Sequence, residues 1–211
     1  MPPKVKFTKE EIVQAALEVA RVKGAAEVTT RDIAAQLGVS TRPIFTWFRS
    51  MDEVRAEIRR AAEERYHGYV AEGLRQPVPF LGYGMQYIRF AREEPERYRL
   101  LFMTAGPDGS NVTSEYESCR AMIQDTLQRI YRMSPQTAEV CFRNLWLVVH
   151  GLATLIVTGD CPYDDDQIRG LLTQCSLSFC LASKEIPGFA AGTFDRDRIF
   201  SELVQRPEAE A

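Results

Sequence analysis

The sequence lacks the features from which most catalytic and metal sites are built. It has only two histidines among 211 residues, and its five cysteines include no C-x-x-C pair. Phosphate-binding glycine loops, nucleophile elbows and metal-ligand spacings are missing as well. We therefore expect a protein that is not an enzyme and that uses neither a metal nor another cofactor.

Long apolar runs and an apolar leader are also missing. The longest apolar stretch, residues 145–157, is interrupted by His150, Gly151 and Thr154 and is shorter than a membrane-spanning helix requires. The first six residues have no apolar segment of the kind that directs secretion. An odd number of cysteines argues against a disulfide framework. We expect a cytoplasmic protein with free thiols and no membrane partner.

Charge of one sign is not in large excess over the whole chain. The 26 basic and 29 acidic residues give a net charge of −3, which argues against a polycation that coats nucleic acid. Residues 1–60, however, contain eleven basic and eight acidic residues. A mildly basic front on an acidic remainder suits a small anion-binding head.

Apolar residues recur at helical spacing, and no segment has the alternation expected of a strand. Two capping boxes, Thr8 with Glu11 and Thr29 with Asp32, mark the first two helix starts. Gly38 is placed to end the second of these helices. The pattern predicts an all-α protein of about nine to ten helices.

Two further start signals complete the front of the chain. Ser40 is expected to cap a third, short helix whose first turn can accept Pro43. Ser50 is expected to begin a connecting helix over residues 51–74. Residues 1–52 are thus predicted to form a three-helix head, and residues 75–211 a larger helical domain. Helices in that larger domain are expected near residues 78–93, 95–104, 113–133, 135–158, 164–184 and 195–205.

Residues 30–49 fit a helix-turn-helix. Ala34 is small enough for two helices to cross closely, and Gly38 can take the left-handed conformation that the turn requires. Three apolar residues are expected to hold the recognition helix against the head: Val39, Ile44 and Trp47. The outward face can reach base edges and phosphates from the major groove, and it consists of Thr41, Arg42, Thr46 and Arg49.

This stretch, TTRDIAAQLGVSTRPIFTWF at residues 29–48, resembles the DNA-binding head of the TetR (tetracycline-repressor-like) transcriptional regulators. The resemblance in motif covers about residues 8–60, and helix number and order extend it over the rest. It implies a homodimer whose two heads bind a palindromic operator on double-stranded DNA and whose C-terminal domain binds a small-molecule inducer. By resemblance, Thr30 and Arg31 would contact phosphate, and Phe45 and Trp47 would lie beside the DNA backbone. The expected DNA-contacting set is completed by Ser40, Thr41, Arg42, Pro43, Thr46 and Arg49.

Two positions depart from the family pattern. Phe45 stands where a tyrosine is usual, so the hydrogen bond from a hydroxyl to phosphate is missing. Met51 stands where a lysine is common, which removes a positive charge. Each lost cationic contact should weaken DNA binding and reduce its salt dependence by about one unit of slope.

Two segments of the larger domain, PERYRLLF at 95–102 and WLVVHG at 146–151, resemble one TetR subgroup with Trp-x-x-x-His-Gly on a long core helix. Trp146 and His150 are four residues apart and so share one helix face. An imidazole among apolar neighbours needs a hydrogen-bond partner. His150 is therefore either a core residue bonded to a backbone carbonyl or a carboxylate, or a polar group lining an inducer cavity.

Aromatic side chains are dense in the helices before residue 135. Such a stripe is either core packing or the wall of a pocket for a largely apolar or aromatic ligand. The candidate ligand-contacting residues are Tyr83, Tyr87, Phe102, Met103, Trp146 and His150.

The two long helices at residues 135–158 and 164–184 have apolar residues at helical spacing. The positions are 138, 141, 145, 148, 152 and 155 on the first, and 168, 171, 172, 175, 179 and 182 on the second. Two copies of this pair suit an intermolecular four-helix bundle. Together with the resemblance, the sequence predicts a homodimeric, ligand-responsive regulator, a repressor more readily than an activator, in which ligand binding tilts the connecting helix. The sequence leaves open whether the ligand releases the repressor from its operator or acts as a corepressor. The alternative is a helical ligand-binding or scaffold protein whose head docks a protein partner, and its binding would lack the steep salt dependence of DNA binding.

Overall fold

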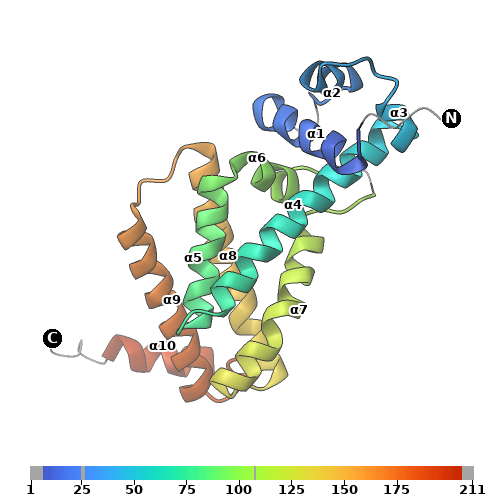
Figure 1. The fold of residues 1–211 in the computed structure, drawn as a ribbon. Helices are drawn as coiled ribbons and strands as arrows, with labels where there is room; N and C mark the ends of the chain where they lie inside the picture. Colours follow the sequence, from blue (N-terminus) through green and yellow to red (C-terminus); the bar gives the residue numbers. More distant parts are fainter. Residues whose placement is uncertain (1–6, 25–26, 107, 206–211) are drawn as a thin grey trace.

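The computed structural model describes residues 7–24, 27–106 and 108–205, and these ranges contain helices and turns but no strand (Figure 1). The all-α prediction is confirmed, as is the predicted number of helices. The elements are α1 (Lys9–Lys23), α2 (Thr30–Leu37), α3 (Ile44–Trp47), α4 (Met51–Leu74), α5 (Pro79–Glu93), α6 (Pro95–Tyr98), the π-helix η2 (Arg99–Met103), α7 (Val112–Tyr131), α8 (Pro135–Thr158), α9 (Asp165–Glu185) and α10 (Arg196–Gln205).

Helices α1 to α3 form a small unit at one end of the molecule, which we call the head (Figure 1). Both predicted capping boxes are present, so α1 begins after Thr8 and α2 after Thr29. Gly38 has the expected left-handed conformation, with φ 65° and ψ 36°. The head core is closed by the first turns of α4, and its fully buried members include Ile12, Ala16, Val28, Ile33, Ile44, Val54 and Ile58.

The third helix differs from the prediction. It has only four residues, Pro43 occupies its N-cap position, and no side chain caps it. Ser40 would bond to an N–H two or three residues further on, and the third residue is Pro43, which has none. Residues 41–46 instead form two overlapping turns, with Ile44 N donating to Thr41 O at 3.1 Å and Thr46 N to Pro43 O at 3.2 Å.

The aromatic anchor of this segment is also not the predicted one. Trp47 is 44% exposed, whereas Phe48 is 2% exposed and packs in the head core. The chain becomes extended at Phe48, with φ −123° and ψ 136°. The backbone thus changes direction at the end of α3, and the Phe48 side chain points into the head core where that of Trp47 does not. The indole Nε1 of Trp47 instead donates to Phe7 O at 2.9 Å, so Trp47 ties the end of α3 to the start of α1.

The 24-residue helix α4 runs from the head across the larger helical unit, which we call the body (α5 to α9) (Figure 1). Its body half lies most closely on α5. A β-carbon placed on Gly73 would lie only 2.7 Å from Gly82 O, so the two helix backbones meet here with no room for a side chain. The attachment of the connecting helix to the body therefore depends on a glycine in each helix.

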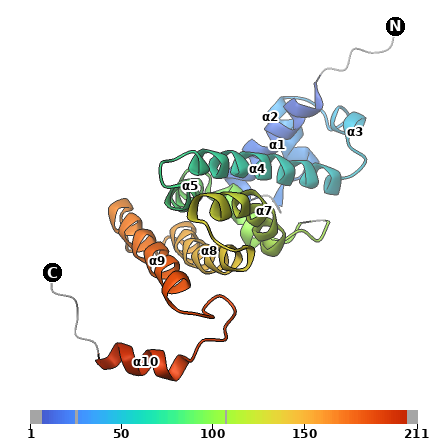
Figure 2. The same ribbon diagram turned by 90° about the horizontal axis from the view of Figure 1, so that it is seen from below.

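Helix α8 is the central helix of the body. Among the described helices it alone is long and apolar enough to cross a membrane, a test that core helices of soluble proteins also pass. Here it packs between α5, α7 and α9, and nine of its residues are buried. α10 contrasts with it, because none of its residues is buried and it lies apart from the body (Figure 2).

The predicted dimer stripe on α8 mostly faces the subunit's own core. Positions 138, 141, 145 and 152 are buried against other helices of the same chain. The apolar side chains left exposed on α8 and α9 are Leu147, Leu155, Leu177 and Leu181. Periodicity alone could not separate these two faces, because α8 is apolar around most of its circumference.

Candidate nucleic-acid interface and ligand site

The residues predicted to contact DNA lie on the surface of the head. Arg31, Arg42 and Arg49 are exposed and form no ion pair with any residue that the structure describes. The other members are exposed or partly exposed: Thr30, Ser40, Thr41, Pro43, Phe45, Thr46 and Trp47. None of the ten belongs to the buried core of the head. Three exposed guanidinium groups without an ion-pair partner in the described ranges lie on this small unit, and such groups are suited to bind phosphate.

The backbone under this surface is held by local hydrogen bonds. At the start of α2, the Lys23 ammonium and the Thr29 hydroxyl lower the pKa of Asp32 to about 2, so the capping carboxylate is ionised at neutral pH. At the turn, Val39 N donates to Ala34 O at 2.9 Å. Hydrogen bonds thus hold the backbone at both ends of α2, the helix that carries Arg31 and leads into the segment with Arg42.

In the body, the aromatic candidates gather around one imidazole. The Nδ1 atom of His150 lies 3.0 Å from the hydroxyl oxygens of both Tyr87 and Tyr98. The Trp146 ring stacks on the imidazole with centroids 4.7 Å apart and an interplanar angle of 5°. Phe102 completes this group, which we call the His150 cluster, at 5.8 Å from the imidazole.

Two of the predicted ligand residues lie differently. Tyr83 is one layer away, with its ring 6.0 Å from that of Tyr87. Met103 is 48% exposed at the end of η2. Tyr98, which the sequence analysis did not select, is a central member and also bonds to Thr154 Oγ1 at 3.0 Å. Tyr98 is the last residue of α6 and lies four residues before Phe102, whose ring centroid is 4.8 Å from its own, so this helical spacing could have marked it.

Burial controls the protonation of the His150 cluster. It lowers the pKa of His150, so the imidazole is neutral at pH 7, and it raises the pKa of Tyr98 to about 12. The partners of His150 are hydroxyls, not the carbonyl or carboxylate expected for a core histidine. Trp146 Nε1 is buried and has no hydrogen-bond partner among the described residues. An unpaired buried donor costs about 1–3 kcal/mol, which an acceptor on a bound molecule would recover.

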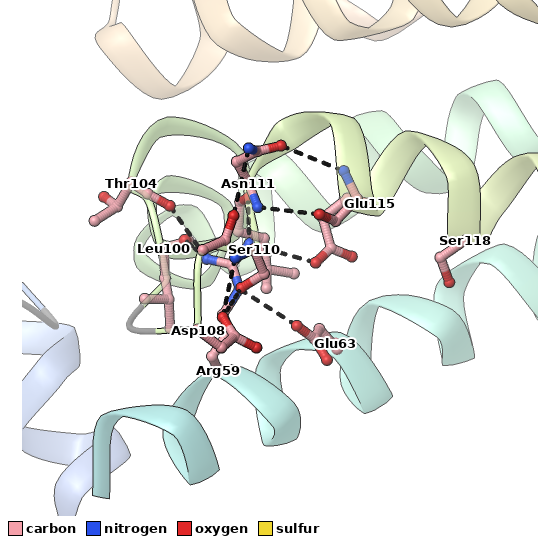
Figure 3. Close-up of polar contacts among 12 residues, drawn as sticks. Arg59, Glu63, Leu100, Thr104, Asp108, Ser110, Asn111, Glu115 and Ser118 are labelled. Atoms are coloured by element: carbon pink, nitrogen blue, oxygen red, sulfur yellow. Dashed lines mark hydrogen bonds and ion pairs between the residues drawn. The ribbon is translucent and has the colours of Figure 1, made fainter. Parts of the chain in front are cut away.

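A second polar site, which the sequence analysis missed, lies where α4 meets the body (Figure 3). Arg59 on α4 and Glu115 on α7 are each 3% exposed. The Arg59 guanidinium donates to Leu100 O at 2.6 Å, to Leu101 O at 3.0 Å and to Thr104 O at 3.1 Å. It also forms ion pairs with Glu63 at 3.3 Å and Glu115 at 3.4 Å. We call Arg59, Glu63 and Glu115 the Arg59 cluster.

Two hollows lie outside the His150 cluster. A cleft of about 590 Å³ lies between α1 of the head and α6 of the body, with Ile58 and Leu100 among its lining residues. A mostly apolar groove of about 290 Å³ lies beside α9, and Leu177 and Leu181 line it. Across the described ranges, no three His, Cys, Asp or Glu side chains come together as a metal site would require.

Comparisons with known proteins match both parts of the chain. Residues 12–58 match a family model described as bacterial regulatory proteins of the tetR family, and residues 80–174 match one described as a tetracyclin repressor-like C-terminal domain. YobS, an uncharacterized HTH-type transcriptional regulator of Bacillus subtilis (strain 168), is 21% identical over 174 residues, which is 81% of this chain and 90% of the relative.

Solved structures share the fold. A TetR-like transcriptional regulator from Rhodococcus sp. RHA1 superposes with a TM-score of 0.61 at 17% identity, covering 80% of this chain and 93% of the other. The multidrug binding protein EbrR, complexed with malachite green, gives a TM-score of 0.58 at 22% identity, covering 82% of this chain and 98% of the other. Each likeness spans more than three quarters of this chain, so the fold is shared beyond the helix-turn-helix.

Proposed function

Because the chain belongs to the TetR family of transcriptional regulators, we propose that it is a homodimeric repressor that leaves a palindromic operator when a small ligand binds the body. In this proposal residues 1–52 bind DNA, and residues 75–211 bind the ligand and the second subunit. Residues 51–74 form the helix that connects these two parts. The protein has no enzymatic role. One observation carries it: an exposed surface with three unpaired arginines and a buried aromatic cluster are joined by the single helix α4.

DNA contact is assigned to the turn and to α3 together. With α3 only four residues long, the side chains available to base edges come mainly from residues 41–46. Arg42 lies in this segment, while Arg31 and Arg49 lie on either side of it in sequence and suit phosphate contacts. Arg42 is therefore the residue on which specific binding should depend most.

The ligand is assigned to the His150 cluster. The aromatic rings favour a largely apolar or aromatic molecule, and the unpaired Trp146 Nε1 favours one with a hydrogen-bond acceptor. The neutral imidazole offers no charge to an anion. The structurally similar protein EbrR was solved in complex with malachite green, so a protein of this fold holds a small-molecule ligand.

Dimer contact is assigned to the exposed faces of α8 and α9. Leu147, Gly151 and Leu155 follow one another at intervals of four along α8, and open space lies beside Gly151. Leu177 and Leu181 add exposed apolar side chains on α9. Two such helix pairs can bury these leucines in a four-helix bundle, with Gly151 permitting close approach.

The test is a gel shift with purified protein and the DNA upstream of its own gene, at two salt concentrations and with scrambled competitor. We expect a shift that survives the competitor and weakens steeply with salt. Arg42→Ala should lower operator affinity by at least tenfold while sedimentation shows an intact dimer. The matched control Arg75→Ala, at the body end of α4, should bind as the wild type does.

Wild-type affinity in the Arg42→Ala variant would refute the role assigned to this residue. If random-sequence selection also recovers no DNA site, the proposal fails. A protein complex that is insensitive to salt would then favour a docking role for the head.

A further inference from the structure

The Arg59 cluster joins three elements that are far apart in sequence. Arg59 and Glu63 lie one turn apart on α4, Glu115 lies on α7, and the three carbonyl groups belong to η2 and the residue after it (Figure 3). The last carbonyls of a helix have no partner within that helix. A side chain of α4 therefore completes the hydrogen bonding of η2.

The same five-residue segment also reaches the His150 cluster. Phe102 of η2 lies 4.8 Å from Tyr98 and 5.3 Å from Tyr87, measured between ring centroids. π-helices are uncommon and often occur at functional sites. η2 thus has its side chains in the proposed ligand site and its carbonyls on the guanidinium of α4. A ligand that displaces the backbone at Phe102 therefore also displaces the neighbouring carbonyls that Arg59 holds.

The charges of this cluster do not balance when all groups are ionised. One guanidinium faces two carboxylates, of which Glu115 is buried and Glu63 is 31% exposed. The pKa of Glu115 rises to about 7 because of its burial and the nearby Glu63. Two other titratable groups interact with the cluster: Asp108, in the loop after η2, interacts with Arg59, and Cys119 on α7 interacts with Glu115.

We infer that Arg59 is the positioning residue through which η2 controls α4, and that a proton held between Glu63 and Glu115 sets how firmly it does so. The inference rests on the proposed function, because α4 ends in the DNA-binding head. When Glu115 ionises, it attracts the guanidinium and repels Glu63 one turn along α4. Both forces act on α4 at the level where it leaves the head.

The experiment uses protons as the perturbing ligand. Operator affinity of the full-length protein is measured at pH 6, 7 and 8 at constant ionic strength, with the thermal unfolding midpoint recorded at each pH. We expect the wild-type dissociation constant to change by at least threefold across this range. Glu115→Gln keeps the size and shape of the side chain but cannot take up or release a proton in this pH range. In this variant the dissociation constant should change by less than 1.5-fold between pH 6 and pH 8. The matched control Glu64→Gln, an exposed carboxylate on α4 next to Glu63, should keep the wild-type profile.

A second variant tests the guanidinium itself. Arg59→Lys keeps the charge but supplies one compact ammonium where three carbonyls and two carboxylates are spread apart. We expect faster hydrogen exchange at the η2 amides and at least a fivefold change in operator affinity. Hydrogen exchange in α2, far from the cluster, should not change.

The outcomes separate this inference from the proposed function. A wild type that binds no operator at any pH defeats the proposed function. A wild type that binds the operator with the same pH profile as Glu115→Gln overturns the inference alone. If Arg59→Lys does not fold, the comparison of Glu115→Gln with Glu64→Gln still decides, because neither variant removes the guanidinium.

Discussion

Two glycines in α4 should respond in opposite ways to the same substitution. Gly68 has open space where a β-carbon would be, with no other atom within 4 Å. A β-carbon on Gly73, five residues further along, would lie 2.7 Å from Gly82 O and 2.8 Å from the α-carbon of Tyr83. Those neighbours are backbone atoms of α5, so they cannot turn aside as the end of a side chain could.

The magnitudes follow from helix propensity and packing. Alanine is favoured over glycine inside a helix by about 1 kcal/mol, so Gly68→Ala should raise the free energy of unfolding by about that amount. Gly73→Ala gains the same helix propensity, but α4 and α5 must separate by several tenths of an ångström before the new β-carbon reaches ordinary van der Waals distance from the α5 backbone. Overpacking of this kind costs about 3 kcal/mol at the upper end, which leaves a net loss of about 2 kcal/mol.

Urea unfolding, followed by circular dichroism at one fixed protein concentration, measures both variants. The expected difference of about 3 kcal/mol between them corresponds to a separation of about 1 M or more in the midpoints. The fixed concentration matters because dimer stability depends on it. If Gly73→Ala proves as stable as the wild type, the conclusion that α4 and α5 are too close at Gly73 to admit a side chain is wrong.

Two further predictions concern single residues. Thr29→Ala removes the capping box of α2 and should lower the free energy of unfolding by about 1 kcal/mol in thermal or urea unfolding, and a change below about 0.3 kcal/mol would show that the cap is unimportant. Burial lowers the pKa of His150, so below pH 6.5 the unfolded chain binds a proton at this residue more readily than the folded protein does. The free energy of unfolding should therefore be unaffected by His150 above pH 6.5 and should fall as the pH drops below 6.5. An NMR titration of the imidazole that gave a pKa of 6.5 or higher would contradict the neutral assignment.

Much of the fold could be predicted because helix boundaries depend on nearby residues. Thr8 and Thr29 each bond to an N–H three residues further on, and such spacings are visible in sequence. The failure at Ser40 has an equally local cause, since Pro43 lacks the N–H that the cap would use. The exposure of the residues proposed to contact DNA could also be predicted, because the apolar positions of a helix-turn-helix leave only one face outward.

The sequence by itself thus determined the all-α fold and the family. Only the tertiary structure decided that Phe48 rather than Trp47 fills the head core, and that Tyr98 joins His150. It also decided that Arg59 and Glu115 are buried together. Tyr98 and His150 are 52 positions apart and Arg59 and Glu115 are 56 apart. Hydrogen bonds within one turn of a helix follow from spacing, whereas contacts across such separations depend on how whole helices pack.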